Sequence, residues 1–122
     1  MRTTTLVAVG VSALAAGALM SAPALAHSEK TVPVKLSGYL FNNKPNLKLA
    51  AKVGDVVKFT WAGGFHNVKT QSAPAGAKKT DSGSAVDKHA PLNVKLTKPG
   101  KYVLYCTPHK ALGMVVTITV TK

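Results

Sequence analysis

Three side chains that bind soft metal ions lie close together near the C-terminus, in the stretch YCTPHKALGM at residues 105–114. Cys106 is the only cysteine of the chain, His109 follows it after two intervening residues, and Met114 follows after four more. A thiolate, an imidazole and a thioether are the soft or borderline donors that transition metals such as copper select. The stretch therefore predicts a metal-binding loop in which these three side chains face one point.

The donor set suits copper that changes its oxidation state. Two imidazoles and a thiolate in a trigonal arrangement, with a weak axial thioether, form a blue-copper electron-transfer site. One imidazole is missing from the stretch, and His27, His66 and His89 are the remaining candidates. We favour His66, because it follows a strand-like segment and the Gly63–Gly64 break, where strands on either side can hold it rigidly.

The elements that must position these residues are β-strands, since apolar and polar residues alternate and no convincing amphipathic helix is present. Pro33 suggests an edge position for the first strand, and residues 70–90 predict a long flexible surface loop with at most one helical turn or short strand. The pattern predicts a single all-β domain over residues 27–122, an antiparallel Greek-key β-sandwich of about seven to eight strands. The predicted strands cover residues 31–36, 39–41, 47–49, 56–61, 65–69, 92–96, 101–106 and 115–120.

Residues 1–26 have the composition of a secretory signal peptide. Arg2 precedes an apolar run, and the segment ends on Ala24-Leu25-Ala26, which fits the small-x-small pattern of a cleavage site. We therefore expect export to the periplasm, or secretion where the host has no periplasm, and a mature chain that begins at His27. A retained membrane anchor is the alternative, although the apolar run is short for a membrane span. Export also makes the lone thiol vulnerable to oxidation, which metal ligation would prevent.

The chain is strongly basic, with a formal net charge of +12 from sixteen Lys and Arg against four Asp and Glu. Such a charge favours acidic partners or anionic surfaces. Nucleic acid is disfavoured, because no arginine follows residue 26 and the lysines are spread singly along the predicted strands. We expect a monomer that meets acidic redox proteins transiently. We expect membrane contact only through such a partner or a retained N-terminal segment.

The combination of motifs resembles the small blue-copper proteins called cupredoxins, with plastocyanin and pseudoazurin nearest by spacing. A Cys-x2-His-x4-Met loop stands before a strand, His66-Asn67 lies upstream, and a Gly54-Asp55 turn precedes the strand that leads to it. The resemblance covers roughly residues 31–122. It implies one type 1 copper ion per chain, with four ligands: His66, Cys106, His109 and Met114.

The resemblance also implies roles for residues around the ligands. It implies that Asn67 braces the site by hydrogen bonds between the first ligand loop and the cysteine loop. It implies that the exposed ring edge of His109 is the electron port, surrounded by an apolar docking patch. We expect this patch to include Gly64, Pro108, Lys110 and Leu112, with the charges of Lys110 and Lys69 guiding acidic partners.

Other functions fit the sequence less well. A periplasmic copper-binding or delivery protein without an electron-transfer role is the alternative, but such proteins favour Met-rich or His-rich clusters, and Met114 is the only methionine after residue 26. We do not expect an enzyme, because copper oxidases and nitrite reductases need a second copper site with further histidine pairs. A copper-free interaction module would keep the sandwich alone.

The remaining histidines and aromatic residues receive structural predictions. We expect His27 to belong to a frayed terminus and His89 to a solvated loop. Phe59 and Trp61 are predicted in the core, and Tyr39 is predicted to be at least partly packed.

Overall fold

A computed structural model describes residues 27–122. The predicted signal peptide lies outside the described residues and stays a prediction. Eight strands and one 3-10 helix follow one another: β1 (Thr31–Ser37), β2 (Leu40–Phe41), β3 (Leu47–Lys52), β4 (Val56–Trp61), β5 (Lys69–Ser72), β6 (Leu92–Lys95), β7 (Gly100–Tyr105), η1 (Thr107–Leu112) and β8 (Val115–Thr121).

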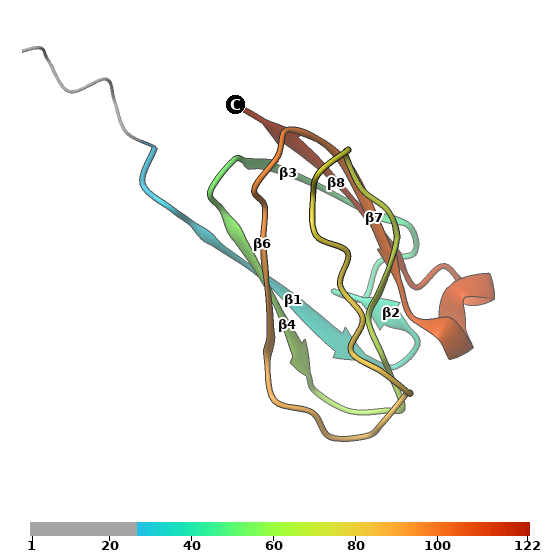
Figure 1. The fold of residues 1–122 in the computed structure, drawn as a ribbon. Helices are drawn as coiled ribbons and strands as arrows, with labels where there is room; N and C mark the ends of the chain where they lie inside the picture. Colours follow the sequence, from blue (N-terminus) through green and yellow to red (C-terminus); the bar gives the residue numbers. More distant parts are fainter. Residues whose placement is uncertain (1–26) are drawn as a thin grey trace, which may run out of the picture.

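The strands form two four-stranded sheets that pack as a sandwich (Figure 1). One sheet has the order β2-β1-β4-β6 and the other the order β3-β8-β7-β5. The predicted all-β sandwich is thereby confirmed, with one difference from the predicted antiparallel pairing. The β1–β4 and β3–β8 pairs are parallel. The first of these arises because β3 lies in the opposite sheet, so the chain crosses over before β4 returns beside β1 in the same direction.

The core between the sheets is built by strand alternation, which turns every second side chain inward. Val34 and Leu36 of β1, Phe59 of β4 and Ile118 of β8 are each at most 1% exposed. The rings of Phe41 and Phe59 meet edge to face, with centroids 5.7 Å apart. The prediction that Phe59 lies in the core is confirmed.

At Pro33, the side of β1 that faces away from β4 has no neighbouring strand. The two-residue strand β2 reaches only Leu36 and Ser37. The carbonyl oxygen of Pro33 instead accepts a hydrogen bond from Nδ2 of Asn42 at 3.3 Å. The missing N–H of proline therefore leaves no ladder position unfilled. The predicted edge position is wrong for β1 as a whole, which lies between β2 and β4, and holds only locally at Pro33.

Two segments differ from the sequence-based expectation. The strand predicted at residues 65–69 begins only at Lys69 and continues to Ser72, because the backbone of His66 pairs with Val86 in an isolated bridge instead of a sheet. The segment after Cys106, predicted as an irregular loop, is the 3-10 helix η1. Pro108 stands in its first turn, where a missing N–H is tolerated.

His27 is tied to the sandwich, contrary to the prediction of a frayed terminus. Its Nε2 atom lies 2.6 Å from Oδ1 of Asp55, whose side chain also accepts hydrogen bonds from the backbone N–H groups of Lys30 and Lys52. These bonds, the one from Lys52 first, lower the pKa of Asp55 to about 2. Asp55 immediately precedes β4, so this contact lies at the end of β4 opposite to the one that leads to His66.

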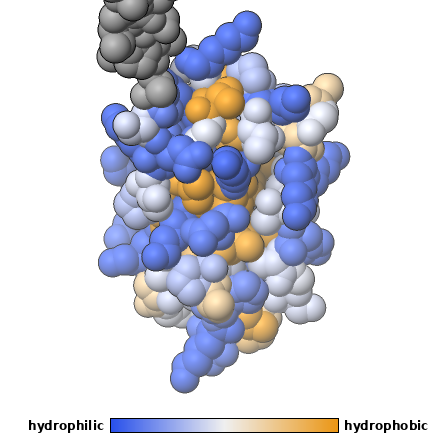
Figure 2. All heavy atoms as spheres, turned by 60° about the vertical axis from the view of Figure 1, so that its left-hand side comes forward, coloured by the Kyte–Doolittle hydropathy of each residue, from blue (hydrophilic) through white to orange (hydrophobic). Residues whose placement is uncertain are grey.

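The surface mixes apolar and charged areas. Figure 2 shows a band of hydrophobic atoms bordered by hydrophilic side chains on the side of the molecule that lies at the left of Figure 1. Within residues 27–122, no helix has the length and apolar character needed to cross a membrane.

Candidate metal centre

The structure brings His66, Cys106 and His109 together at one end of the sandwich. The Cys106 Sγ atom lies 3.8 Å from Nδ1 of His66 and 3.5 Å from Nδ1 of His109. One donor atom from each of the three residues falls within 4.8 Å of the others. His66 comes from the segment after β4 and the other two from the segment after β7, so neighbouring strand ends of opposite sheets bring the donors together.

The ring orientation of His66 is set by a second hydrogen bond. Its Nε2 atom lies 2.8 Å from the carbonyl oxygen of Gly63, which can only accept, so Nε2 carries the proton. The lone pair then resides on Nδ1, the atom that faces Cys106. A backbone carbonyl on the outer nitrogen is the usual way in which proteins orient a metal-binding imidazole.

Gly64 lies against this ring, and its missing side chain makes room for His66. A Cβ atom at residue 64 would lie 2.7 Å from Nε2 of His66 and 3.2 Å from the carbonyl oxygen of Gly38. Its φ of +87° is also a conformation that residues with side chains rarely adopt. Gly64 is thus a requirement of the ligand loop as well as an exposed part of the surface beside it.

Met114 is fully buried, and its backbone is hydrogen-bonded to the two other ligand candidates of its loop. Its carbonyl oxygen accepts the N–H of Cys106 at 3.0 Å, and its N–H donates to the carbonyl oxygen of His109 at 3.2 Å. Gly113 ends η1 in the left-handed conformation, with a φ of +98°, and a Cβ there would approach Pro45 to 2.9 Å. The tight turn therefore holds Met114 next to the two ligand candidates that precede it.

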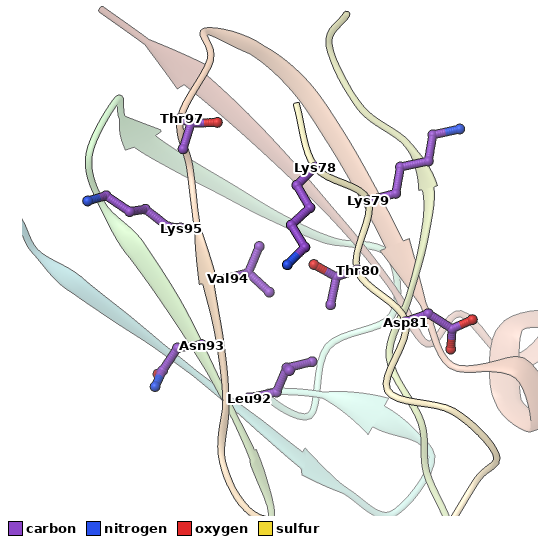
Figure 3. A pocket seen from close by; sticks show the side chains of 9 residues that line it. All are labelled: Lys78, Lys79, Thr80, Asp81, Leu92, Asn93, Val94, Lys95 and Thr97. Atoms are coloured by element: carbon purple, nitrogen blue, oxygen red, sulfur yellow. The ribbon is translucent and has the colours of Figure 1, made fainter. Parts of the chain in front are cut away.

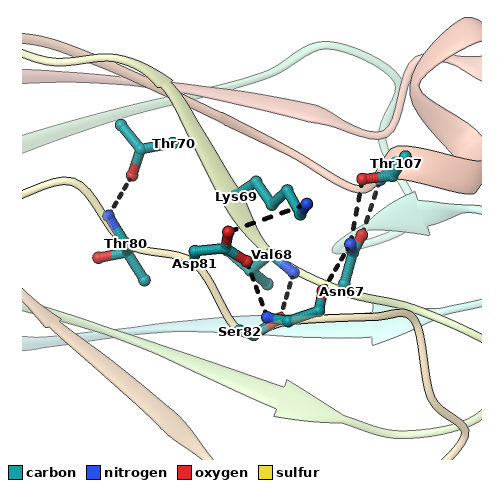
Figure 4. A network of polar contacts seen from close by, with 9 residues as sticks. Asn67, Val68, Lys69, Thr70, Thr80, Asp81, Ser82 and Thr107 are labelled. Carbon is teal, nitrogen blue, oxygen red and sulfur yellow. Dashed lines mark hydrogen bonds and ion pairs between the residues drawn. The ribbon is translucent and has the colours of Figure 1, made fainter.

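Asn67 joins the two ligand segments (Figure 4). Its Oδ1 atom accepts the backbone N–H of Thr107 at 2.7 Å, and its Nδ2 group donates to Oγ1 of Thr107 and to the carbonyl oxygen of Gly83, each at 3.0 Å. The side chain is buried, so these partners replace the water that it would otherwise bind. Asn67 follows His66 and Thr107 follows Cys106, and the bonds consequently fix the separation of the two ligand backbones.

The long loop after β5 is also fastened to the first ligand segment, where the sequence predicted a flexible loop. Val68 donates its N–H to Oγ of Ser82, and Ser82 returns its own N–H to the carbonyl oxygen of Val68 (Figure 4). His66 and Val86 exchange a pair of backbone hydrogen bonds. Lys69 forms an ion pair with Asp81 at 3.8 Å. Residues 80–86 therefore act as a brace for His66.

Burial changes the acid–base properties of two ligand candidates. Desolvation lowers the pKa of His66, which keeps its imidazole neutral and able to donate a lone pair. Desolvation likewise raises the pKa of the Cys106 thiol, although the backbone N–H groups of Asn67 and His109 act in the opposite direction. A thiolate at this depth needs a positive charge beside it, and a bound metal ion supplies one.

His109 is partly exposed, and large apolar side chains surround its position. The ring of Tyr39 meets the ring of His109 edge to face, with centroids 5.0 Å apart. Tyr39 is 61% exposed, so its predicted partial packing is limited to this contact, and Phe65 and Leu112 are 57% and 58% exposed. Tyr39 and Leu112 also line a shallow hollow of about 400 Å³. Exposed apolar side chains of this size, on the segments that carry one cluster of functional residues, are typical of an interaction site.

The four residues predicted for the docking patch all lie at the surface. Gly64, Pro108, Lys110 and Leu112 are exposed. The Lys110 ammonium group lies 4.5 Å from the centre of the Tyr105 ring, a cation–π contact that restrains it beside η1. Sequence reasoning missed Phe65 and Tyr39. The first has a local signal in its position next to His66, whereas Tyr39 has none, because it is distant in sequence from His109.

The other two histidines lie outside the cluster. His27 contacts Asp55, as described above. His89 is exposed as predicted, but its ring stacks on Trp61, with centroids 4.4 Å apart. Trp61 is only partly buried, and its Nε1–H donates to the carbonyl oxygen of His66 at 3.0 Å. The choice of His66 as the first imidazole therefore agrees with the geometry, and Trp61 adds another restraint on its backbone.

The donor chemistry fits copper. The Nδ1 atoms of two imidazoles face one cysteine sulfur, and a buried thioether residue is hydrogen-bonded through its backbone to the same loop. Soft sulfur ligands combined with imidazole are the set that copper prefers in proteins, whereas hard cations such as Mg²⁺ or Ca²⁺ require oxygen ligands.

Comparison with known proteins gives a consistent result. Residues 31–121 match the model of the copper binding proteins of the plastocyanin/azurin family. The plastocyanin of Prochlorothrix hollandica is 37% identical over 88% of this chain and 85% of its own length. The chloroplastic plastocyanin of Oryza sativa subsp. indica is 32% identical over 93% of this chain and 72% of its own. The crystal structure of pseudoazurin from Methylobacterium extorquens AM1 superposes with a TM-score of 0.62 at 31% identity, covering 75% of this chain and 76% of that one.

Proposed function

Because the chain belongs to the plastocyanin/azurin family of copper-binding proteins, we propose that it carries single electrons between redox partners through one type 1 copper ion. The copper is held by four side chains: His66, Cys106, His109 and Met114. One observation carries the proposal, namely that the Cys106 sulfur faces Nδ1 of both His66 and His109. Bound copper supplies reversible one-electron chemistry between its two oxidation states.

The protein itself contributes rigidity. The hydrogen bonds from His66 to Gly63 and from Thr107 to Asn67 hold the donors in one arrangement. A site that does not rearrange when the charge changes opposes electron transfer little. Like its family, the chain is an electron carrier and not an enzyme.

The docking patch explains how electrons reach the site. His109 is the ligand candidate that is not fully buried, and Tyr39, Phe65 and Leu112 supply apolar surface near its ring. The exposed patch members are Gly64, Pro108, Lys110 and Leu112. An electron carrier needs transient partners, and the net charge of +12 favours acidic ones, which would be steered to the patch and released readily.

The site of action follows from the N-terminal sequence. Residues 1–26 have the pattern of a secretory signal peptide, so the carrier would work in the periplasm or outside the cell as a single domain over residues 27–122. N-terminal sequencing of the protein isolated from its host tests this, since a chain starting at Met1 would contradict export with cleavage.

Copper titration of the purified protein tests the function. We expect one equivalent of Cu(II) to produce an intense blue absorption band, and cyclic voltammetry to show a reversible one-electron couple. Cys106→Ser should abolish the band, whereas Ser72→Ala, at an exposed serine of β5, should keep it. A pale complex without a reversible couple would instead support copper binding and delivery, and failure to take up copper would contradict both functions.

A further inference from the structure

The outer edge of β6 presents backbone groups that no neighbouring strand uses. β6 ends its sheet and pairs only with β4. Just beyond its C-terminus, Leu96 donates its N–H to Asp55 and accepts the N–H of Gly54, so its polar groups point toward the β4 side. Because these directions alternate along a strand, the N–H and C=O groups of Asn93 and Lys95 point the other way. Within residues 27–122, none of them is hydrogen-bonded to another part of the chain.

A groove of about 490 Å³ runs beside this edge. Its second wall is residues 78–81 of the long loop, which lies next to β6 without pairing with it (Figure 3). That wall is held from its far side, because Thr80 accepts the N–H of Thr70 and donates its own N–H to Oγ1 of Thr70. Both walls are thus anchored to separate sheets, and the space between them remains open.

The groove combines an apolar base with a basic rim. Leu92 and Val94 contribute the apolar surface, and three lysines lie on the walls (Figure 3). Lys78 directs its ammonium group into the groove, whereas Lys79 and Lys95 extend outward from the two walls. Among the described residues that line the groove, Asp81 is the only acidic one, and it is paired with Lys69. Lys95 is paired with Glu29 at 3.4 Å, so Lys78 and Lys79 are the lysines of the groove without an ion pair to a described residue. The groove therefore carries a positive potential beside an unused row of backbone donors and acceptors.

We propose that this groove binds an extended acidic segment of a partner protein, which adds to β6 as the fifth strand of its sheet. Strand addition to an exposed sheet edge draws affinity from main-chain hydrogen bonds and specificity from alternate side chains. Here the backbones of Asn93 and Lys95 supply the hydrogen bonds, and Lys78 and Lys79 pair with acidic side chains of the added segment. A second copy of this chain is a poor occupant, because both strands would bring the same lysines.

This second contact goes beyond the proposed electron transfer. The residues that line the groove include no member of the His66–Cys106–His109 cluster and no residue of the docking patch. A partner held at β6 would leave the ring of His109 accessible, and it would raise the effective concentration of the carrier near that partner.

Amide hydrogen exchange measured by NMR on the Cu(I)-loaded protein tests the proposal. The probe is a synthetic peptide of alternating Glu and Val with blocked ends. At saturation, exchange at the amides of Asn93 and Lys95 should slow about tenfold or more, because they gain hydrogen bonds. The amides of Leu92 and Val94, already directed toward β4, should change little.

Matched variants separate the contributions. Asn93→Pro removes an outward N–H without affecting the β4 ladder and should weaken binding at least about tenfold, and the blue band of the oxidised form reports that the fold is kept. Lys78→Gln should weaken binding up to about fivefold, whereas Lys101→Gln, at an exposed lysine outside the groove, should not. An N-methylated version of the peptide tests the main-chain contacts with no change to the protein.

Several outcomes would overturn the proposal. Equal binding of the N-methylated peptide would show that strand pairing is not required. Equal binding of a peptide with Gln in place of Glu would show that charge is not required. Chemical-shift changes at lysines on all faces, without slowed exchange at Asn93 and Lys95, would show unspecific attraction. Slowed exchange with anionic phospholipid vesicles but not with the peptide would identify a membrane surface instead. Electron transfer is not measured, so any of these results leaves the proposed function intact.

Discussion

The side-chain oxygen of Asn67 accepts a hydrogen bond of 2.7 Å from the backbone N–H of Thr107, forty residues further along the chain. Each of these residues directly follows a metal-ligand candidate, His66 and Cys106 respectively. A buried amide with three hydrogen bonds has almost no freedom to adjust. The distance between the two ligand segments is therefore a property of the folded protein.

Replacement of Asn67 by Ala should destabilise the protein by roughly 2 kcal/mol, because the N–H of Thr107 and the carbonyl oxygen of Gly83 lose buried partners. Chemical denaturation of the Cu(I) form gives this difference, and the reduction potential should shift in the same variant. Asn93→Ala, at an exposed side chain, is the control and should remain within about 0.5 kcal/mol of the wild type. Equal stability of the two variants would contradict a bracing role for Asn67.

Gly64→Ala should weaken copper binding at least about tenfold and reduce the blue band, since the added methyl group would displace the ring of His66. Gly63→Ala is a sharp control. Its φ of +132° strains an alanine as well, but its added Cβ would meet no atom within 4 Å. If both variants lose copper to the same extent, backbone strain and not contact with His66 is responsible. Competition with a Cu(II) chelator measures the affinities.

Asp55→Asn should lower stability at neutral pH, and the difference from the wild type should disappear in acid. The folded-state pKa of Asp55 is lowered from 3.8 to about 2, so the folded state favours the ionised carboxylate. Its contribution is present above about pH 4 and is lost as the pH falls toward 2. Denaturation midpoints at intervals between pH 2 and pH 7 provide the test. Asp87→Asn, at an exposed residue without an ion pair to any other described residue, should show no such difference.

Leu112→Glu should slow electron self-exchange between two copies of the protein about tenfold, because each encounter would bury a carboxylate in the docking patch. The added negative charge alone would reduce repulsion between two basic proteins and would act in the opposite direction. Thr119→Glu, an exposed position on β8, carries the same charge away from His109 and should not slow the exchange. NMR line broadening in mixed Cu(I) and Cu(II) samples measures the rate. A slower exchange in both variants would argue against docking at Leu112.

Much of the ligand set was accessible from the sequence because its signals are local. Cys106, His109 and Met114 lie within residues 106–114 and were recognisable by donor type and spacing. His66 required only the expectation that a strand end and a glycine break would place it nearby. The sandwich followed from residue alternation along β1, β4 and β8, where apolar residues recur at every second position and are the buried ones.

The features that the sequence did not reveal depend on contacts between distant segments. Tyr39 reaches His109, and Ser82 binds Val68. Residues 70–90 are rich in small and polar side chains, which predict a flexible loop, yet backbone pairing with Val68 and His66 decides the path of this segment. The parallel pairing of β1 with β4 likewise depends on a crossover, which alternation alone cannot encode.

The contact between His27 and Asp55 has a practical consequence for handling the molecule. It brings the chain into the sandwich at the start of β4, whereas η1, the red coil that carries His109, lies at the other end (Figure 1). A linker fused ahead of His27 would begin away from the port. A bead or sensor chip that captures the protein by this linker would display the His109 face to dissolved partners, with each molecule oriented alike.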